Sequence, residues 1–165
     1  MAECKNIMVY VETAEGNPVK VGLEMLSPAK KLAYKVTAVV IGGGVADAAK
    51  EVAKAGADQV ICVDSEDYKE FNLDAYAQVL VELVKEENPE AVFVGGTQDG
   101  KDIAPVVAAK CNTGCASDVL DIKAEDGEVI YTCPLYGGTV LEDVKIKTTP
   151  QIACLLYTSD AADDK

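Results

Sequence analysis

Gly95, Gly100 and Lys101 stand at the spacing of a phosphate-binding loop, G-x-x-x-x-G-K-[ST], within the stretch VGGTQDGKDIAP. Such a loop holds phosphates with backbone N–H groups, neutralises them with the lysine and uses the final hydroxyl to help hold Mg²⁺. The final position here is Asp102, which removes the hydroxyl and brings a carboxylate beside the expected anion. Two like charges about 4 Å apart repel by about 4 kcal/mol at an effective dielectric of about 20. The sequence therefore disfavours nucleotide triphosphate hydrolysis.

Two other interpretations of this loop are open. In one, the glycines end a strand and let a helix approach it closely, Asp102 caps that helix, and Pro105 lies in its first turn. In the other, glycine backbone and helix dipole bind a nucleotide without hydrolysing it. The candidate cofactor-binding residues are Gly95, Gly96, Thr97, Gly100 and Tyr136.

Tyr136 and Asp118 each admit two roles. Tyr136, in CPLYGGT, either stacks on a flavin or adenine ring or covers a hairpin. Asp118, in GCASDVLDI, is either a polar lining of a cleft or a turn residue.

The residue types that are missing limit the chemistry. All 15 basic residues are Lys, and the chain contains no His, Arg or Trp. It therefore offers no imidazole base or ligand and no bidentate guanidinium for phosphate. The net charge of −13 opposes binding to nucleic acid. We expect no catalytic residues and no metal site in this chain.

The six cysteines are expected to be reduced structural thiols. The spacing Cys111-x-x-x-Cys115 is not that of a zinc-binding C-x-x-C pair, and the sequence has no second closely spaced cysteine pair that could complete a zinc site. Cys62 lies in the apolar run QVICV, where we expect it to be buried.

Apolar runs and helical periodicity alternate along the first two thirds of the chain. Strands are expected at 6–12, 35–43, 57–64 and 91–96, the last fully apolar and so central. Helices are expected at 45–56, 73–89 and 102–111, and around Leu26, Ala29, Leu32 and Ala33, with Ser27-Pro28 as cap and first-turn proline. From Ser117 to Lys147, Asp-Gly and Gly-Gly turns between short β-prone runs indicate antiparallel strands.

This order predicts an α/β fold: three layers, α/β/α, with a mainly parallel, nucleotide-binding-like sheet and a C-terminal antiparallel hairpin region. The loops at 42–44 and 95–100 follow strands, and open α/β sheets bind ligands at that edge. The chain has no apolar run of about 18 residues and no signal-like N-terminus, so we expect a cytoplasmic protein without membrane insertion.

Four segments carry a family resemblance: IMVYVET, AGADQVICVD, GGTQDGKDIAPVVAAKCNTGCASDV and YTCPLYGGTV. In this order, over residues 6–153, they resemble the N-terminal domain of the electron transfer flavoprotein alpha subunit. The most specific part is 94–118, with G-x-D-[IL]-A-P-x-x-A followed by T-G.

The resemblance implies one subunit of a heterodimeric, FAD-containing electron carrier of prokaryotes. Such a carrier takes electrons from dehydrogenases, including those of fatty acid beta-oxidation, and passes them to a membrane oxidoreductase or takes part in flavin-based bifurcation. The fragment would dock the beta subunit and shape the cofactor cleft. FAD would be held mainly by a C-terminal domain of the alpha subunit, and AMP or a second FAD by the beta subunit.

The chain departs from the family pattern in four places. The C-terminal FAD domain has no counterpart in these 165 residues, and Cys133-Pro134 stands where Arg-Pro is frequent. Pro28 interrupts a helix that is usually unbroken. Residues 154–165 (CLLYTSDAADDK) do not resemble the family's continuation, so we expect a domain at 1–153 followed by a non-native or disordered tail.

A second hypothesis is a stand-alone adenine-nucleotide-binding module of the stress-protein type. It would use the glycine loops at 42–44 and 95–100.

Overall fold

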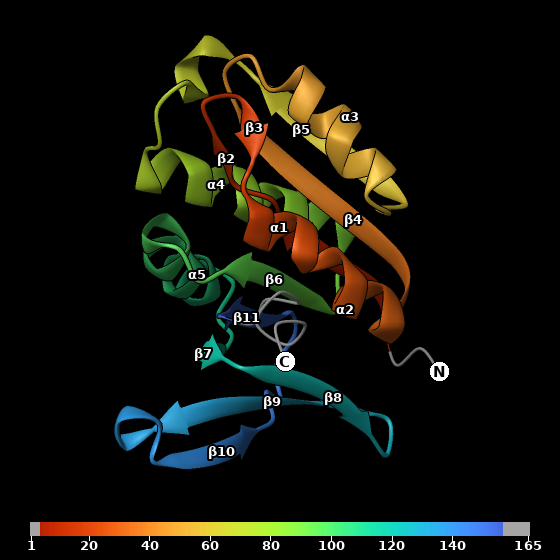
Figure 1. The fold of residues 1–165 in the computed structure, drawn as a ribbon, viewed down its shortest axis with the longest axis vertical. Helices are drawn as coiled ribbons and strands as arrows, with labels where there is room; N and C mark the ends of the chain where they lie inside the picture. Colours follow the sequence, from red (N-terminus) through yellow and green to blue (C-terminus); the bar gives the residue numbers. More distant parts are fainter. Residues whose placement is uncertain (1–3, 157–165) are drawn as a thin grey trace.

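A six-stranded parallel sheet forms the centre of the computed structural model, which describes residues 4–156 (Figure 1). Its strands are β1 (Cys4–Tyr10), β4 (Ala33–Gly42), β5 (Gln59–Asp64), β6 (Ala91–Gly95), β7 (Cys115–Val119) and β11 (Gln151–Leu155). Their order in the sheet is β5-β4-β1-β6-β11-β7. All five residues of β6 are buried, which confirms the central place that its apolar sequence predicts.

Helices cover both faces of this sheet, as the sequence predicts. α1 (Lys20–Glu24), α2 (Leu26–Leu32) and α3 (Ala46–Lys54) pack on one face, and α4 (Leu73–Glu87) and α5 (Gln98–Lys110) on the other. Along β1, Ile7 and Val9 join the first core cluster, whereas Met8 and Tyr10 join the second. This alternation places one strand in contact with both helical layers.

The first helical segment is broken at Met25, which ends α1 and begins α2. Pro28 has no N–H to bond to the carbonyl of Glu24, so one continuous helix is disfavoured there. Pro28 does lie in the first turn of α2, but the expected Ser27 cap is wrong, because Met25 occupies the cap position without a side-chain hydrogen bond. Ala33, expected on the helix, begins β4.

The other helices follow their local signals. Asn72 caps α4 by accepting a hydrogen bond from the N–H of Ala75 at 3.0 Å, and Asn88 ends it in the left-handed conformation. A short 3₁₀ helix, η1 (Glu66–Tyr68), precedes it. Between β1 and α1, β2 (Thr13–Ala14) and β3 (Asn17–Pro18) form a small hairpin that brings Glu15 and Gly16 to its turn.

Cys62 is exposed, which corrects the expectation of a buried thiol. Its strand, β5, is at the edge of the sheet, and the residues of this strand are half-buried or exposed. An apolar run on an edge strand has no neighbour on one side, so it is buried less than the same run in the centre. All six cysteines are free thiols.

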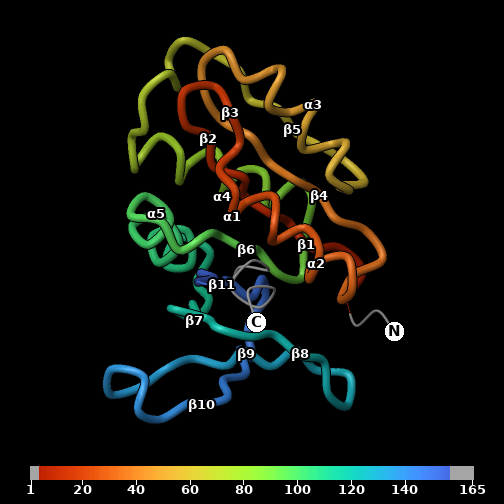
Figure 2. Tube along the Cα trace, viewed as in Figure 1, coloured from red at the N-terminus to blue at the C-terminus, as the bar shows by residue number. Residues whose placement is uncertain are grey.

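A three-stranded antiparallel sheet completes the fold (Figure 2). It consists of β8 (Asp121–Glu125), β9 (Glu128–Leu135) and β10 (Val140–Val144), in the order β10-β9-β8, with the 3₁₀ turn η2 (Tyr136–Gly138) joining β9 and β10. Tyr131 anchors it: its ring meets Phe93 edge-on at 6.5 Å, and its hydroxyl donates to Oε1 of Gln151 at 2.8 Å.

Two boundaries differ from the expected ones. Residues 117–119 belong to β7 of the parallel sheet, and β8 begins only at Asp121; within β7, Asp118 has a φ of 53°. The strand β11 was not predicted. It inserts between β6 and β7, where it pairs Cys154 with Val94 and Leu155 with Gly95. The domain therefore continues past Ala153; the rest of the expected tail, 157–165, lies outside the described residues.

No helix within residues 4–156 is long and apolar enough to cross a membrane.

Candidate functional site

The glycine loop after β6 leads directly into α5, which begins at Gln98 rather than at Asp102. Thr97 is its cap: the Thr97 hydroxyl oxygen accepts a hydrogen bond from the N–H of Gly100 at 3.0 Å. The expected cap at Asp102 and the expected first-turn position of Pro105 are therefore wrong, because both residues lie farther inside the helix.

Close packing of strand against helix accounts for the glycines. A Cβ on Gly100 would lie 1.9 Å from the carbonyl oxygen of Gly95, and a Cβ on Gly95 would lie 2.7 Å from Cγ1 of Val21. At Gly100 the clash is with backbone, so a side chain does not fit; at Gly95 the Val21 side chain would have to move. The close-approach interpretation of the loop is confirmed.

Several polar groups of the same loop already have partners within the chain. The N–H of Gly96 donates to the carbonyl of Leu155 at 2.7 Å, and the N–H of Lys101 donates to the carbonyl of Thr97 at 2.8 Å. The amine of Lys101 lies 4.0 Å from the carboxylate of Asp118, so this lysine reaches towards β7. These engaged donors and the direction of the lysine disfavour a phosphate cradle at this loop.

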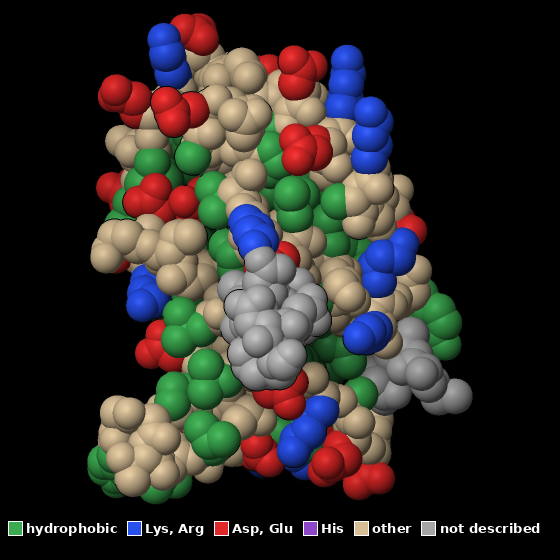
Figure 3. Space-filling model, in the orientation of Figure 1, with side chains coloured by type: hydrophobic (Ala, Val, Ile, Leu, Met, Phe, Trp, Pro, Cys, Tyr) green, Lys and Arg blue, Asp and Glu red, His purple; other side chains and the backbone are tan. Residues whose placement is uncertain are grey.

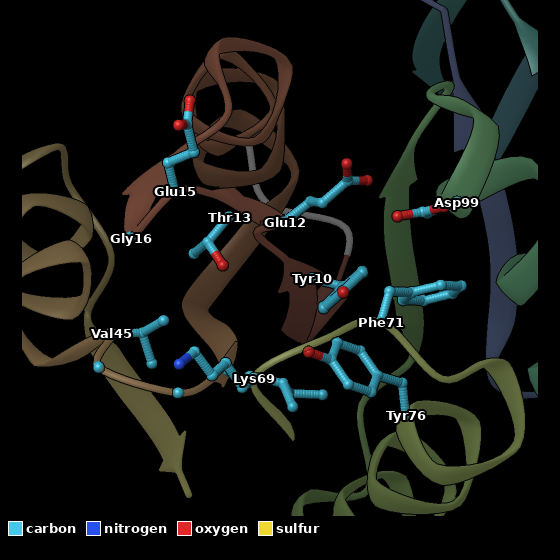
Figure 4. A pocket seen from close by; sticks show the side chains of 14 residues that line it. Tyr10, Glu12, Thr13, Glu15, Gly16, Val45, Lys69, Phe71, Tyr76 and Asp99 are labelled. Atoms are coloured by element: carbon cyan, nitrogen blue, oxygen red, sulfur yellow. The ribbon is translucent and has the colours of Figure 1, made fainter. Parts of the chain in front are cut away.

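A cavity of about 400 Å³ lies beside the loop, at the carboxyl ends of β1, β4 and β6 (Figure 4). Tyr10 and Glu12 reach it from the end of β1, Tyr76 from α4 and Asp99 from the first turn of α5. The remaining lining residues come from the β2–β3 hairpin, the glycine loop after β4 and the segment before α4: Thr13, Glu15, Gly16, Ile41, Gly42, Gly43, Gly44, Val45, Lys69 and Phe71.

The strand order explains why the cavity forms here. The connection that leaves β1 runs to β4 on one side, whereas β6, on the other side of β1, leads away through α5. Connections that leave neighbouring strands in opposite directions open a crevice, which is where open α/β sheets bind ligands. The expectation that the loops at 42–44 and 95–100 lie at this edge is confirmed; the first lines the cavity and the second reaches it through Asp99.

The cavity is acidic. Burial and the nearby Asp99 carboxylate raise the pKa of Glu12 above its ordinary value, although the hydroxyl of Thr97, which donates to Oε1 of Glu12 at 2.5 Å, opposes this rise. Burial and the charge of Glu12 raise the pKa of the Tyr10 phenol above its ordinary range. The N–H of Gly44 donates to Oδ1 of Asp64 at 2.7 Å, so a carboxylate already occupies a donor of the other glycine loop.

The candidate cofactor residues are not all brought together. Gly95, Gly96, Thr97 and Gly100 form one unit at the start of α5, which touches the cavity's lining through the Thr97–Glu12 hydrogen bond. Tyr136 lies on η2 of the antiparallel sheet, is 82% exposed and does not line the cavity. Cofactor binding by these five residues stays a prediction.

Sequence reasoning missed the cavity's main polar groups, Tyr10, Glu12 and Asp99. One signal was present: Glu12 and Thr13 directly follow the apolar run of the first strand, at the edge where ligands bind. Asp99 was hidden because the expected helix began after it.

A parallel sheet covered by helices, with a crevice where its strand order reverses, defines an α/β domain of the nucleotide-binding-like class. Within this class, the chain belongs to the electron transfer flavoprotein domain family, whose model matches residues 7–164.

The most similar relatives include alpha subunits of this family. Protein FixB of Clostridium saccharobutylicum is 36% identical over 160 residues, which cover 93% of this chain and 48% of that protein. The electron transfer flavoprotein subunit alpha of Clostridium acetobutylicum is 36% identical over 149 residues, covering 87% and 44%. Subunit LctC of a lactate dehydrogenase (NAD(+),ferredoxin) of Acetobacterium woodii is 30% identical, covering 98% and 40%.

The chain thus spans about half the length of the curated relatives it matches. Among solved structures, a calicheamicin glycosyltransferase, CalG4, aligns with 74% of this chain and 34% of its own, with a TM-score of 0.43 and 17% identity. This distant likeness carries no functional argument.

Proposed function

We propose that this chain acts as the N-terminal portion of an electron transfer flavoprotein alpha subunit and docks the beta subunit through its antiparallel sheet. Family membership supports the first part of this proposal. The second part rests on one observation: large apolar side chains are exposed on that sheet.

Three of these side chains lie on η2 and β10. Tyr136 is 82% exposed, Leu141 59% and Val140 46%. Hydrophobic side chains are visible at the β9–β10 end of the small sheet in Figure 3, while charged side chains gather at its other end. Val140 and Leu141 are consecutive strand residues, so β10 exposes an apolar side chain on each face of the sheet, and exposed apolar side chains can mark interaction sites.

The strand β10 is also open for pairing. It is at the edge of the three-stranded sheet, so one side of its backbone has no neighbouring strand within that sheet. An open edge next to exposed apolar side chains suits a partner protein better than a small ligand. In this arrangement Tyr136 is a docking residue, and Gly95, Gly96, Thr97 and Gly100 hold α5 in position.

The redox chemistry belongs to the whole carrier in this proposal. FAD is held mainly by the C-terminal domain of the alpha subunit, and the engaged donors of the glycine loop agree with a minor role for this loop. The chain has no catalytic residues of its own. The assembled carrier works in the cytoplasm, between dehydrogenases and either a membrane oxidoreductase or a bifurcating partner, and its beta subunit holds AMP or a second FAD.

Size-exclusion chromatography of the chain mixed with a matching beta subunit tests the docking proposal. The unaltered chain should co-elute, and Val140→Lys with Leu141→Lys should weaken the complex at least about tenfold, because apolar residues at the centre of an interface carry most of the affinity. Tyr34→Lys is the matched control: Tyr34 is 77% exposed at the start of β4, away from β10. Equal co-elution of both variants would refute this docking surface.

A further inference from the structure

The cavity at the carboxyl ends of β1, β4 and β6 contains the hydroxyl group of a buried tyrosine, which has no hydrogen-bond partner among the described residues. Tyr10 is only 2% exposed, and its side chain lines the cavity beside Tyr76 (Figure 4). The Tyr76 hydroxyl, in contrast, donates to the backbone carbonyl of Tyr68. The Tyr10 hydroxyl oxygen is accessible from the cavity, so a bound molecule can form a hydrogen bond with it there.

The charges around Tyr10 determine which molecule fits. Glu12 and Asp99 both act electrostatically on the Tyr10 phenol, and Glu15 adds a third carboxylate at the hairpin turn. Lys69 is the only basic residue among the lining residues, and its amine extends towards Val45 rather than towards Asp99 (Figure 4). The part of the cavity near Tyr10 therefore has negative charge without a cation to balance it.

The acceptors in this part of the cavity match an ammonium group. A primary ammonium has three N–H donors and no acceptor. Glu12, Asp99 and Tyr10 supply three acceptor groups, and Glu12 keeps free lone pairs beyond the one that Thr97 uses. The rings of Phe71 and Tyr76 meet edge-on at 5.0 Å and provide an apolar wall next to these oxygens.

We propose that this cavity binds a small organic cation, a primary ammonium attached to an apolar or aromatic group. The ammonium donates to Glu12, Asp99 and the hydroxyl oxygen of Tyr10, and the apolar group packs against Phe71 and Tyr76. A nucleotide is the opposite kind of ligand, because its phosphates would face the carboxylates of Glu12, Glu15 and Asp99.

A matched pair of probes isolates the contribution of charge. Isothermal titration calorimetry of the 165-residue chain with 2-phenylethylamine should show saturable binding. The neutral counterpart 2-phenylethanol should bind at least about tenfold more weakly, since a charge-assisted hydrogen bond is stronger than a hydrogen bond between neutral groups. Equal binding of amine and alcohol, or binding of AMP without binding of the amine, overturns the proposal. No binding of the amine overturns it as well.

Substitutions of cavity residues test whether the amine binds in this cavity. Tyr10→Phe should weaken amine binding about fivefold and Asp99→Asn about tenfold, the second change being on a half-buried residue that tolerates replacement. Tyr34→Phe and Asp47→Asn are the matched controls, because Tyr34 is 77% exposed and the Asp47 side chain 98% exposed, and neither lines the cavity. Circular dichroism confirms that each variant is folded. Unchanged affinity in both cavity variants would show that the amine binds elsewhere and overturn the proposal.

Discussion

The carboxyl group of Glu12 is partly buried at the edge of the core, and this environment raises its pKa. Burial is the main cause, the charge of Asp99 adds to it, and the hydrogen bond from Thr97 only partly opposes it. A carboxyl group whose pKa is raised on folding stabilises the fold fully at pH values below its ordinary pKa. That contribution is lost as the pH rises through the raised value, so the ionisation of Glu12 destabilises the folded chain.

Glu12→Gln is therefore expected to stabilise the protein at pH 7. Glutamine resembles the protonated carboxyl group and keeps an oxygen that accepts from Thr97. Thermal unfolding between about pH 4 and pH 8 should show a higher melting temperature for the variant at pH 7 and a difference that shrinks towards pH 4.

Glu15→Gln serves as the control for this substitution. Glu15 is exposed at the hairpin turn, so its replacement should leave the melting temperature nearly unchanged. A Glu12→Gln variant that is less stable at pH 7, or whose advantage persists at pH 4, would contradict the argument.

The packing of α5 against β6 depends on one glycine. Alanine usually favours a helix over glycine by about 1 kcal/mol. At Gly100, however, the new Cβ would lie 1.9 Å from the carbonyl oxygen of Gly95, which is backbone and cannot rotate away. The clash outweighs the helical preference.

Gly100→Ala is thus expected to destabilise the chain by at least about 2 kcal/mol, which corresponds to a melting temperature roughly 5 °C lower. Gly114→Ala is the matched control, since its Cβ would lie 3.4 Å from Cγ2 of Ile146, an ordinary contact. Differential scanning calorimetry measures both. A Gly100→Ala variant as stable as the control would contradict this close approach of strand and helix.

The solvent exposure of the six cysteines depends on where each one lies in the fold. Cys62 is exposed on the edge strand β5, Cys111 and Cys115 are half-buried, and Cys4, Cys133 and Cys154 are buried. Burial raises the pKa of Cys154 to about 11, with the charge of Asp118 among the smaller causes, so its thiolate is scarce at neutral pH.

Native thiol titration at pH 7.5 should therefore modify Cys62 first, and Cys4, Cys133 and Cys154 only after unfolding. Even Cys62 should react more slowly than a free thiol, because partial desolvation on the strand and the charge of Asp64 raise its pKa. Cys62→Ser is the control and should remove the first reacting thiol. Modification of Cys154 in the folded protein at the rate of Cys62 would contradict the order of the strands in the sheet.

The amino-acid sequence by itself determined the class of fold and the family. The local signals are four apolar runs, the periodicity of 73–89 and the motif around 94–118. Such signals can be recognised in the sequence without knowing which elements pack together. They predicted the parallel sheet, its central strand and the covering of both faces.

Only the tertiary structure decided where α5 begins, that Cys62 is exposed, and that β11 inserts between β6 and β7. Each depends on contacts between residues far apart in the chain, such as Cys154 with Val94, or on packing between elements, such as Gly100 with Gly95. The acidic cavity is the clearest case. Tyr10, Glu12 and Asp99 come from two distant segments, and they become neighbours because β1 and β6 pair in parallel and end at the same edge of the sheet.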